Sequence, residues 1–461
     1  MHHYAAKVRE LLRKTLTYTP KAYVLTFGCQ QNEADSERML GAAISMGYDP
    51  ALSPEDADLI LVNTCAIREH AEKRALSIIG QFKHLKAKNP QLIIGVGGCM
   101  TAQKHRLDQL KHSYPYVDIV FGTASIHRIP EMVYGVLTSG RRTFRDTDTG
   151  SSDFQTVAEG IPVRRASPSR AWVSIMYGCN NFCSYCIVPY VRGRERSRRP
   201  EEILAEVQTL VADGCRDITL LGQNVNSYGR GLDIETDIAD LIRAVDSIAG
   251  DFRIRFMTSH PKDASEKLIQ TMASCEKAAR HFHLPMQSGS DEILRRMNRR
   301  YDAARYLSIV EALRRAMPEI AITSDIIVGF PGETEDDFEA TLEALRRAEF
   351  DMIYSFLFSP RKGTPAAEME CQVPEEIKSA RFTRLLETQN EISRKKNEAY
   401  IGRTVRVLSE GASKNDPAMY TGRTSGAKLV HFPDGADTEG TFVEIKIDRA
   451  DTFTLYGSRV I

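Results

Sequence analysis

Three cysteines lie close together in the segment MYGCNNFCSYC, where Cys179, Cys183 and Cys186 have the spacing C-x3-C-x2-C. Three thiolates on one tight loop hold three corners of a cubic iron–sulfur cluster, whereas a closed structural site normally has four protein ligands. The missing fourth cysteine therefore indicates a cluster with one iron open to a small ligand. A zinc site with a distant fourth ligand, or a set of redox thiols, is the alternative that the spacing leaves open.

Three further cysteines are far apart in the sequence, but each one closes a strand-like run: FGC at Cys29, NTC at Cys65 and GGC at Cys99. Ligands gather beyond the carboxyl ends of parallel strands, so we expect these cysteines to converge on one edge of a sheet as a second three-cysteine site. The glycines before them allow the backbone to approach a bulky ligand closely. Buried free thiols are the alternative. The other three cysteines are interpreted as ordinary thiols.

Around the second set, strand-like apolar runs alternate with amphipathic helical runs in the order strand, helix, strand, helix, strand. This order predicts an open parallel α/β domain over residues 20–138. The expected strands cover 23–27, 59–62 and 92–96, and the expected helices cover 33–46 and 67–85. Residues 139–168 are rich in Ser, Thr, Asp and Arg without sustained periodicity, which is typical of a linker.

Six strand–helix units follow, and they predict a (βα)6-type partial barrel over residues 169–396 with its chemistry at the carboxyl ends of the strands. The expected strands are 172–176, 217–221, 253–257, 281–284, 321–328 and 352–358. Five short β-type runs then predict a small OB-like β-barrel over 397–461.

Composition limits the class of protein. The 461 residues are 42% hydrophobic and 26% charged, which is typical of a globular chain, and no apolar run is long enough for a membrane span. The N-terminus lacks the apolar stretch of a signal peptide, so we expect a cytoplasmic protein. Lys and Arg together number 61, as do Asp and Glu. Any contact with nucleic acid must therefore come from local patches.

The cysteine triplet at the start of the expected barrel resembles that of the radical S-adenosylmethionine superfamily. Two three-cysteine sites followed by a small β-barrel together resemble the methylthiotransferase family, and the last domain resembles a TRAM RNA-binding domain. Several stretches resemble its tRNA-modifying branch: FGCQQNEADSE, YGCNNFCSYCIVPYVRGRERSRRP, LLGQNVNSYG, HLPMQSGS and SDIIVGFPGET. The resemblance implies methylthiolation of C2 of N6-isopentenyl (dimethylallyl) adenosine at position 37 of tRNA.

The same resemblance implies two 4Fe–4S clusters and two molecules of S-adenosylmethionine, one as methyl donor and one as the source of a 5′-deoxyadenosyl radical. A ring C–H bond has no useful acidity, so a cofactor-derived radical is reasonable. No catalytic side chain is assigned beyond the cluster ligands. Candidates for binding S-adenosylmethionine at the barrel mouth are Gln223, Asn224, Ser259, Gln287 and Asp325, with Tyr185 packing on its adenine.

A basic run, VRGRERSRRP, follows the cluster loop and is the leading candidate for contact with RNA phosphates. Its arginines are Arg192, Arg194, Arg196, Arg198 and Arg199. A second basic group, Arg295, Arg296, Arg299 and Arg300, is interpreted as the solvated face of a helix. In the last domain, base-stacking and phosphate-binding residue types alternate as in an RNA-binding barrel, and core packing is the alternative for the aromatic ones. These residues are Tyr420, Arg423, Lys428 and Phe432.

The expected partners are a tRNA anticodon stem-loop, an electron donor such as flavodoxin or ferredoxin, and a source of sulfur, with no membrane and a monomeric chain. Three alternative functions stay open. Two are methylthiolation of threonylcarbamoyladenosine-37 of tRNA and methylthiolation of a ribosomal protein aspartate. The third is a non-catalytic iron–sulfur protein that binds RNA, which open three-cysteine coordination disfavours.

Overall fold

The structure is a computed structural model that describes residues 1–67, 69–145, 159–414, 416, 418–433 and 438–460. The middle of the predicted linker, residues 146–158, lies outside the described residues. The chain divides into two compact units. Unit 1 comprises Met1–Ala166, Met176–Asn180 and Cys186–Arg198, and unit 2 comprises Ser167–Ile175, Asn181–Tyr185 and Arg199–Ile461. None of the helices in the described ranges combines the length and the apolar character that crossing a membrane requires.

Unit 1 is built on a six-stranded, fully parallel sheet with the strand order β2-β1-β3-β4-β5-β6. Its strands are β1 (Lys21–Thr26), β2 (Asp49–Pro50), β3 (Leu59–Thr64), β4 (Ile93–Gly98), β5 (Ile119–Val120) and β6 (Thr143–Phe144). Both β3 and β4 are buried along their whole length, as the continuous apolar run of a parallel strand covered on both faces predicts. The predicted open parallel α/β domain is confirmed.

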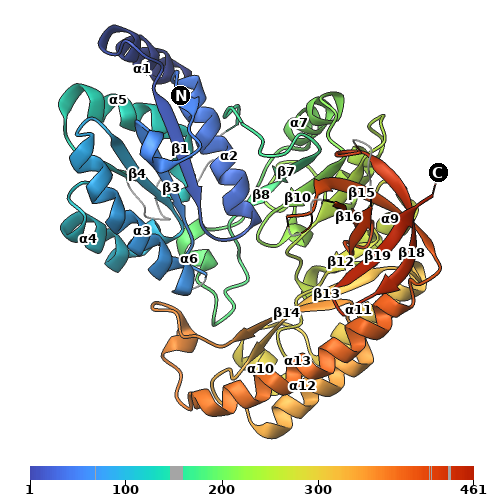
Figure 1. Cartoon of the computed structure of the whole chain (residues 1–461). Helices are drawn as coiled ribbons and strands as arrows, with labels where there is room; N and C mark the ends of the chain where they lie inside the picture. Colours follow the sequence, from blue (N-terminus) through green and yellow to red (C-terminus); the bar gives the residue numbers. More distant parts are fainter. Residues whose placement is uncertain (68, 146–158, 415, 417, 434–437, 461) are drawn as a thin grey trace. The chain divides into compact units, whose positions relative to one another are not determined.

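Helices cover both faces of this sheet (Figure 1). They are α1 (His2–Thr15), α2 (Gln30–Ser45), α3 (Glu69–Lys88), α4 (Lys104–Ser113) and α5 (Ile129–Ser139). The predicted domain begins at residue 20, but α1 also belongs to this core, because Ala5, Val8 and Leu12 are buried in the same cluster as Met39 of α2. Unit 1 also contains the short hairpin β8 (Met176–Tyr177) and β9 (Arg196–Ser197), and between them α6 (Val188–Arg192).

Unit 2 contains all six strands predicted for the partial barrel, in two parallel sheets of order β11-β10-β7 and β12-β13-β14. They are β7 (Arg170–Ser174), β10 (Asp217–Leu221), β11 (Arg253–Phe256), β12 (His281–His283), β13 (Ala321–Val328) and β14 (Met352–Leu357). The accompanying helices are α7 (Pro200–Ala212), α8 (Ile238–Asp246), α9 (Glu266–Ser274), α10 (Asp291–Arg296), α11 (Ala303–Ala316), α12 (Glu335–Ala348) and α13 (Glu375–Glu398).

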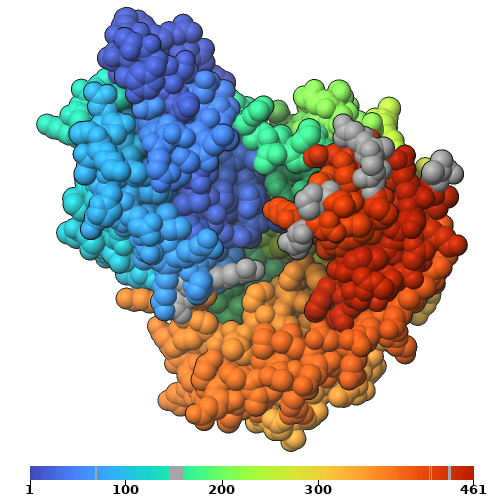
Figure 2. Space-filling model, viewed as in Figure 1, coloured from blue at the N-terminus to red at the C-terminus, as the bar shows by residue number. Residues whose placement is uncertain are grey.

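The last strands close a five-stranded barrel in the order β15-β16-β17-β19-β18, which confirms the predicted small β-barrel. They are β15 (Thr404–Ala412), β16 (Met419–Thr424), β17 (Leu429–Pro433), β18 (Phe442–Ala450) and β19 (Thr454–Arg459). Figure 2 shows its surface, in red, directly against the orange helical part of the same unit. Phe432 is fully buried in the barrel core, and Lys428 forms a buried ion pair with Asp351. Both side chains therefore hold structure rather than RNA.

Two arginines of β11, Arg253 and Arg255, form hydrogen bonds with backbone carbonyls of this barrel and so connect it to the parallel strands. Arg255 donates through Nη2 to the carbonyl of Thr424 (2.7 Å) and through Nη1 to that of Ser425 (2.8 Å), while its Nε pairs with Asp217 (2.9 Å). Arg253 donates to the carbonyls that end β16. Because these groups are buried, their hydrogen bonds fix where the C-terminal barrel docks within unit 2.

An Arg255→Ala variant should lose about 3 kcal/mol of stability at this junction, because it leaves Asp217 buried with only the more distant Arg253 to offset its charge. Hydrogen exchange of the β16 and β17 amides should report the loss. The matched control is Arg403→Ala, whose exposed pair with Glu319 should contribute less than about 1 kcal/mol. Equal losses of stability in the two variants would show that the buried hydrogen bonds of Arg255 do not hold the barrel in place.

Candidate iron–sulfur centres

Cys29, Cys65 and Cys99 lie together at the carboxyl edge of the unit 1 sheet. Thr64 of β3 is in register with Gly98 of β4, so the residues that follow them, Cys65 and Cys99, leave neighbouring strands side by side. The amide of Cys99 donates to the carbonyl of Thr64 (2.9 Å). Cys29 follows β1 and occupies the N-cap of α2. The strand ends thus bring together the three cysteines that the sequence predicts to converge.

Burial governs the electrostatics of this site. Desolvation raises the pKa of the Cys99 thiol to about 12; Arg192 opposes this rise, and the nearby Cys65 and Cys29 add to it. A metal that coordinates a thiol deprotonates it outright, so binding a cluster here releases protons. In the described part of the chain, no group of three His, Cys, Asp or Glu side chains is arranged to hold a metal ion. The role of the three thiols as ligands of an iron–sulfur cluster stays a prediction.

Arg192 belongs to this cysteine site, and its burial does not support the prediction that it binds RNA. It ends α6 and is buried, with its Nε donating to the Sγ of Cys99 (3.2 Å). Its Nη2 donates to Oδ1 of Asn32 (2.7 Å) and to Oδ2 of Asp35 (2.9 Å), both on α2. A guanidinium enclosed by these groups presents no face to a phosphate.

The other four arginines of the basic run divide by exposure. Arg198 is buried in a two-point pair with Glu159 (2.7 and 2.8 Å), which does not support its predicted RNA contact. Arg196 is half-buried, 6.0 Å above the Tyr177 ring. Arg194 is exposed, and Arg199 is exposed and paired with Asp233 (2.9 Å). These last two keep the predicted role in RNA binding.

The loop with the first cysteine triplet passes through both units, and its parts are described separately. In unit 1, buried Cys179 follows β8 and its amide donates to the carbonyl of Gly193 (3.1 Å), while Cys186 is half-buried. In unit 2, buried Cys183 accepts a hydrogen bond from Nη1 of Arg299 (3.3 Å). Their role as ligands of an iron–sulfur cluster stays a prediction.

Arg299 is a site residue that the sequence analysis misplaced. Its neighbours Arg295 and Arg296 pair with Glu292 at the surface of α10, but Arg299 lies beyond the helix end and is buried. Besides Cys183 it donates to the carbonyl of Pro285 (2.9 Å) and to the hydroxyl of Tyr301 (2.9 Å). The spacing of a basic run does not show which arginine turns inward, so no sequence signal marked this residue.

The residues predicted to bind S-adenosylmethionine lie within or just after successive strands of unit 2. Ser259, after β11, donates to the carbonyl of His283. Gln287, after β12, has a φ of +74°, and its backbone N–H donates to the backbone carbonyl of Asp325 (2.8 Å). The carboxylate of Asp325 lies 3.5 Å from Nε2 of His283. These hydrogen bonds connect the ends of β11, β12 and β13.

The segment after β10 offers buried polar atoms with no partner among the described residues. Asn224 uses its Nδ2 on Asp263 (2.8 Å) but leaves Oδ1 without a hydrogen bond, and neither polar atom of the Asn226 side chain has one. Gln223 is half-buried beside them. Unsatisfied buried amides are rare and expensive, so they fit a polar ligand such as S-adenosylmethionine. Tyr185 is half-buried against Ile293, Met297 and Phe330, and its predicted contact with adenine is untested.

The glycines beside the unit 1 cysteines have two different roles. Gly28 has a φ of +121°, and a Cβ there would lie 3.1 Å from the Sγ of Cys65 and 2.9 Å from its Cβ. The space beside Gly97 is instead filled by the ring of Phe121, 2.4 Å from where a Cβ would stand. The expectation of close approach to a ligand therefore fits Gly28 and not Gly97.

A Gly28→Ala variant should lose most of the iron bound at Cys29, Cys65 and Cys99, because the added methyl group displaces the Cys65 side chain and strains a left-handed backbone. Iron analysis should fall by about half from about eight atoms per chain. The control is Gly80→Ala in α3, where a Cβ meets nothing within 4 Å and helix propensity favours alanine by about 1 kcal/mol. Full iron content in Gly28→Ala would contradict this account of the site.

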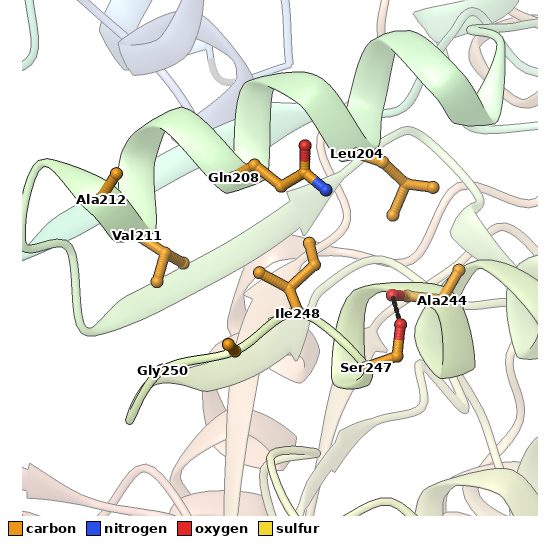
Figure 3. Close-up of a pocket in the computed structure, with 9 residues that line it drawn as sticks. Leu204, Gln208, Val211, Ala212, Ala244, Ser247, Ile248 and Gly250 are labelled. Carbon is orange, nitrogen blue, oxygen red and sulfur yellow. Dashed lines mark hydrogen bonds between the residues drawn. The ribbon is translucent and has the colours of Figure 1, made fainter.

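An apolar groove between α7 and α8 lies apart from this chemistry (Figure 3). It has a volume of about 750 Å³. Its lining residues are Leu204, Gln208, Val211, Ala212, Ala244, Ser247, Ile248, Ala249 and Gly250. None of them is a titratable or metal-ligating side chain of the kind an active site needs. The groove is therefore not assigned to either cysteine site.

Three protein-family models match the chain in the order of its domains. Uncharacterized protein family UPF0004 matches residues 21–122, the Radical SAM superfamily matches 173–345, and the TRAM domain matches 398–460. The first match holds Cys29, Cys65 and Cys99, and the second holds Cys179, Cys183 and Cys186. The fold and the two sites thus define a radical S-adenosylmethionine protein with an additional cysteine-bearing domain and a TRAM barrel.

Curated relatives define the family further. A protein from Clostridium novyi (strain NT) is 49% identical over 440 residues, covering 95% of this chain and 96% of its own length. Another from Caldicellulosiruptor saccharolyticus is 50% identical over 435 residues, covering 94% of this chain and 91% of its own length. Each is named "tRNA-2-methylthio-N(6)-dimethylallyladenosine synthase". The chain belongs to this family of radical S-adenosylmethionine methylthiotransferases, which confirms the resemblance found in its motifs.

Solved structures support the fold alone. The chain superposes on the radical S-adenosylmethionine methyltransferase TsrM from Kitasatospora setae, solved with its tryptophan substrate and an S-adenosylmethionine analogue bound, with a TM-score of 0.57. The two chains are 14% identical, and the match covers 81% of this chain and 89% of the other. The predicted fold class is confirmed.

Proposed function

We propose that this protein methylthiolates C2 of N6-dimethylallyladenosine at position 37 of tRNA. The observation that carries the proposal is two separate sets of three cysteines, Cys29/Cys65/Cys99 and Cys179/Cys183/Cys186, on a scaffold shared with the curated synthases over almost their whole length. Three-cysteine coordination leaves an open iron at each cluster, one for S-adenosylmethionine and one for the sulfur that receives the methyl group.

When bound, a cluster held by Cys179, Cys183 and Cys186 would supply the electron for reductive cleavage of S-adenosylmethionine, and a cluster held by Cys29, Cys65 and Cys99 would carry the sulfur that is methylated and transferred. The residues of the chain hold and enclose them. Cys65 and Cys99 are buried at the sheet edge, which keeps water from the sulfur. Asn224 and Asn226 present unsatisfied amide atoms to the nucleoside or amino acid part of S-adenosylmethionine.

The anticodon stem-loop is the proposed RNA ligand, with exposed Arg194 and Arg199 contacting its phosphates and the C-terminal barrel adding RNA affinity. A flavodoxin or ferredoxin is the proposed electron donor, and a separate sulfur source restores the sulfur consumed. We also propose a monomeric enzyme in the cytoplasm.

The basic run is one possible basis for choosing between the competing substrates, because an enzyme that modifies a ribosomal protein aspartate has no need of it. Two of its arginines, Arg192 and Arg198, have structural partners in unit 1. The charge of the basic run is therefore weaker evidence for a tRNA substrate over a ribosomal protein substrate than its five arginines indicate. The names of the relatives favour dimethylallyladenosine over both alternatives.

An assay with purified components tests the proposal. Anaerobically reconstituted protein, S-adenosylmethionine and dithionite should convert tRNA that carries dimethylallyladenosine into the methylthio form, detected by mass spectrometry of nucleosides. The same tRNA without the dimethylallyl group and tRNA with threonylcarbamoyladenosine are the controls. Product on the threonylcarbamoyl tRNA alone would replace the proposal with the competing tRNA substrate.

A further inference from the structure

Each cysteine set has one buried arginine that donates a hydrogen bond to a cysteine sulfur. In unit 1, Nε of Arg192 lies 3.2 Å from the Sγ of Cys99. In unit 2, Nη1 of Arg299 lies 3.3 Å from the Sγ of Cys183. Arg192 is 3% exposed and Arg299 is 8% exposed. The cysteine sites thus share one feature that their sequence spacing does not show.

The two arginines differ in their other partners. Arg192 forms an ion pair with Asp35 at 2.9 Å, and the Asp35 side chain is itself 3% exposed, so this pair has no net charge. Arg299 makes no ion pair with any carboxylate among the described residues. Its remaining partners, the Pro285 carbonyl and the Tyr301 hydroxyl, are neutral. Arg299 therefore places an uncompensated positive charge beside Cys183. The positive charge of Arg192 beside Cys99 is instead balanced by Asp35.

An uncompensated buried guanidinium requires an anion close by. Arginine does not release its proton in a protein, and an isolated charge in an apolar environment is expensive. A cluster held by three thiolates supplies negative charge beside Cys183. Cluster potentials depend on net charge, on hydrogen bonds to the sulfurs and on burial. A nearby positive charge favours the reduced cluster, which is more negative than the oxidised one by one electron.

We propose that these two arginines set the order in which the clusters accept an electron. Arg299 favours one-electron reduction of the cluster at Cys179, Cys183 and Cys186, and Arg192, neutralised by Asp35, leaves the cluster at Cys29, Cys65 and Cys99 oxidised. A low-potential one-electron donor, such as dithionite in vitro, supplies the electron. This inference rests on the proposed function, because it assumes both clusters. Both arginines are positioning residues and not catalytic ones.

Redox titration monitored by electron paramagnetic resonance tests the proposal on the full-length, anaerobically reconstituted protein without S-adenosylmethionine. The Cys65→Ala and Cys183→Ala variants, each retaining one cluster, assign the two midpoints. The Arg299→Gln variant should disfavour reduction of the Cys183 cluster at least tenfold. Its midpoint potential should therefore fall by about 59 mV or more for one electron, while the midpoint potential of the other cluster should not change. The Arg299→Lys variant, which keeps the charge, should recover most of this shift.

Asp35→Asn provides a test in the opposite direction, since it removes the charge that neutralises Arg192. This variant should make the Cys99 cluster easier to reduce, again by about tenfold, and should leave the Cys183 cluster unchanged. A purely structural role of these residues predicts lost iron or a broadened signal, and it does not predict shifts of opposite sign at two different clusters.

Three results would overturn the inference while leaving the proposed function in place. The first is wild-type iron content with unmoved midpoints in both Arg299→Gln and Asp35→Asn. The second is a raised KM for S-adenosylmethionine in Arg299→Gln with an unmoved midpoint, which would make Arg299 a ligand of its carboxylate. The third is a wild-type protein in which the Cys99 cluster is reduced first. A wild-type protein that binds no second cluster would instead defeat the proposed function.

Discussion

Replacement of Cys183 by alanine is expected to reduce cleavage of S-adenosylmethionine to background and to remove about four of about eight irons per chain. Two thiolates do not hold a cubic cluster with one open iron, and Cys183 is the cysteine of this set that Arg299 contacts. Production of 5′-deoxyadenosine under dithionite measures the loss. Iron analysis on the same sample shows whether the other cluster remains.

The control for this variant is Cys371→Ser, because Cys371 is exposed and belongs to neither cysteine set. It should retain full iron content and full cleavage. Formation of 5′-deoxyadenosine at the wild-type rate in Cys183→Ala would show that the radical does not come from the cluster at this loop.

Replacement of Cys65 by alanine should have a different outcome. The variant is expected to lose the other half of the iron and all methylthiolation of tRNA, yet to keep cleaving S-adenosylmethionine. The reason is that Cys65 lies at the sheet edge of unit 1, whereas Cys183 and its partner Arg299 lie in unit 2. Iron content, 5′-deoxyadenosine and modified nucleoside are measured together.

The matched variant here is Cys215→Ala, which removes a buried thiol that belongs to neither cysteine set and whose Sγ donates to the carbonyls of Ser169 and Asp217. It should keep all the iron. A Cys65→Ala protein with about eight irons would remove Cys65 from the ligand set. Loss of both clusters together would show that the two sites do not form independently.

Local sequence patterns predicted the parts of the fold that matter for the cysteines. Continuous apolar runs such as 59–62 are buried on both faces of a parallel sheet, and the carboxyl ends of neighbouring parallel strands necessarily share an edge. The convergence of Cys29, Cys65 and Cys99 follows from these two facts alone. The six strands of unit 2 were predictable for the same reason.

The roles of the arginines were not predictable in this way. A basic run reveals charge but not direction, and the run from Arg192 to Arg199 divides between buried partners such as Asp35 and Glu159 and the exposed surface. Those partners are distant in sequence. Arg299 was missed for a similar reason, since only the tertiary structure shows that it turns inward beyond the end of α10.

The two cysteine sets are directly connected along the chain through α6. Cys186 closes the first cysteine triplet, and α6 begins two residues later and ends at Arg192, the partner of Cys99. Ile187 and Val191 pack with Cys99 in one buried cluster. The segment from Ile187 to Arg192 is therefore part of the second cysteine site.

The central claim is that this protein converts dimethylallyladenosine at position 37 of tRNA into its 2-methylthio derivative. Mass spectrometry of nucleosides from the tRNA of cells with and without the gene tests it most directly. The account predicts that the methylthio nucleoside disappears without the gene, that dimethylallyladenosine accumulates in its place, and that wild-type protein but not Cys65→Ala restores the modification. Unchanged amounts of the methylthio nucleoside in cells lacking the gene would contradict the account.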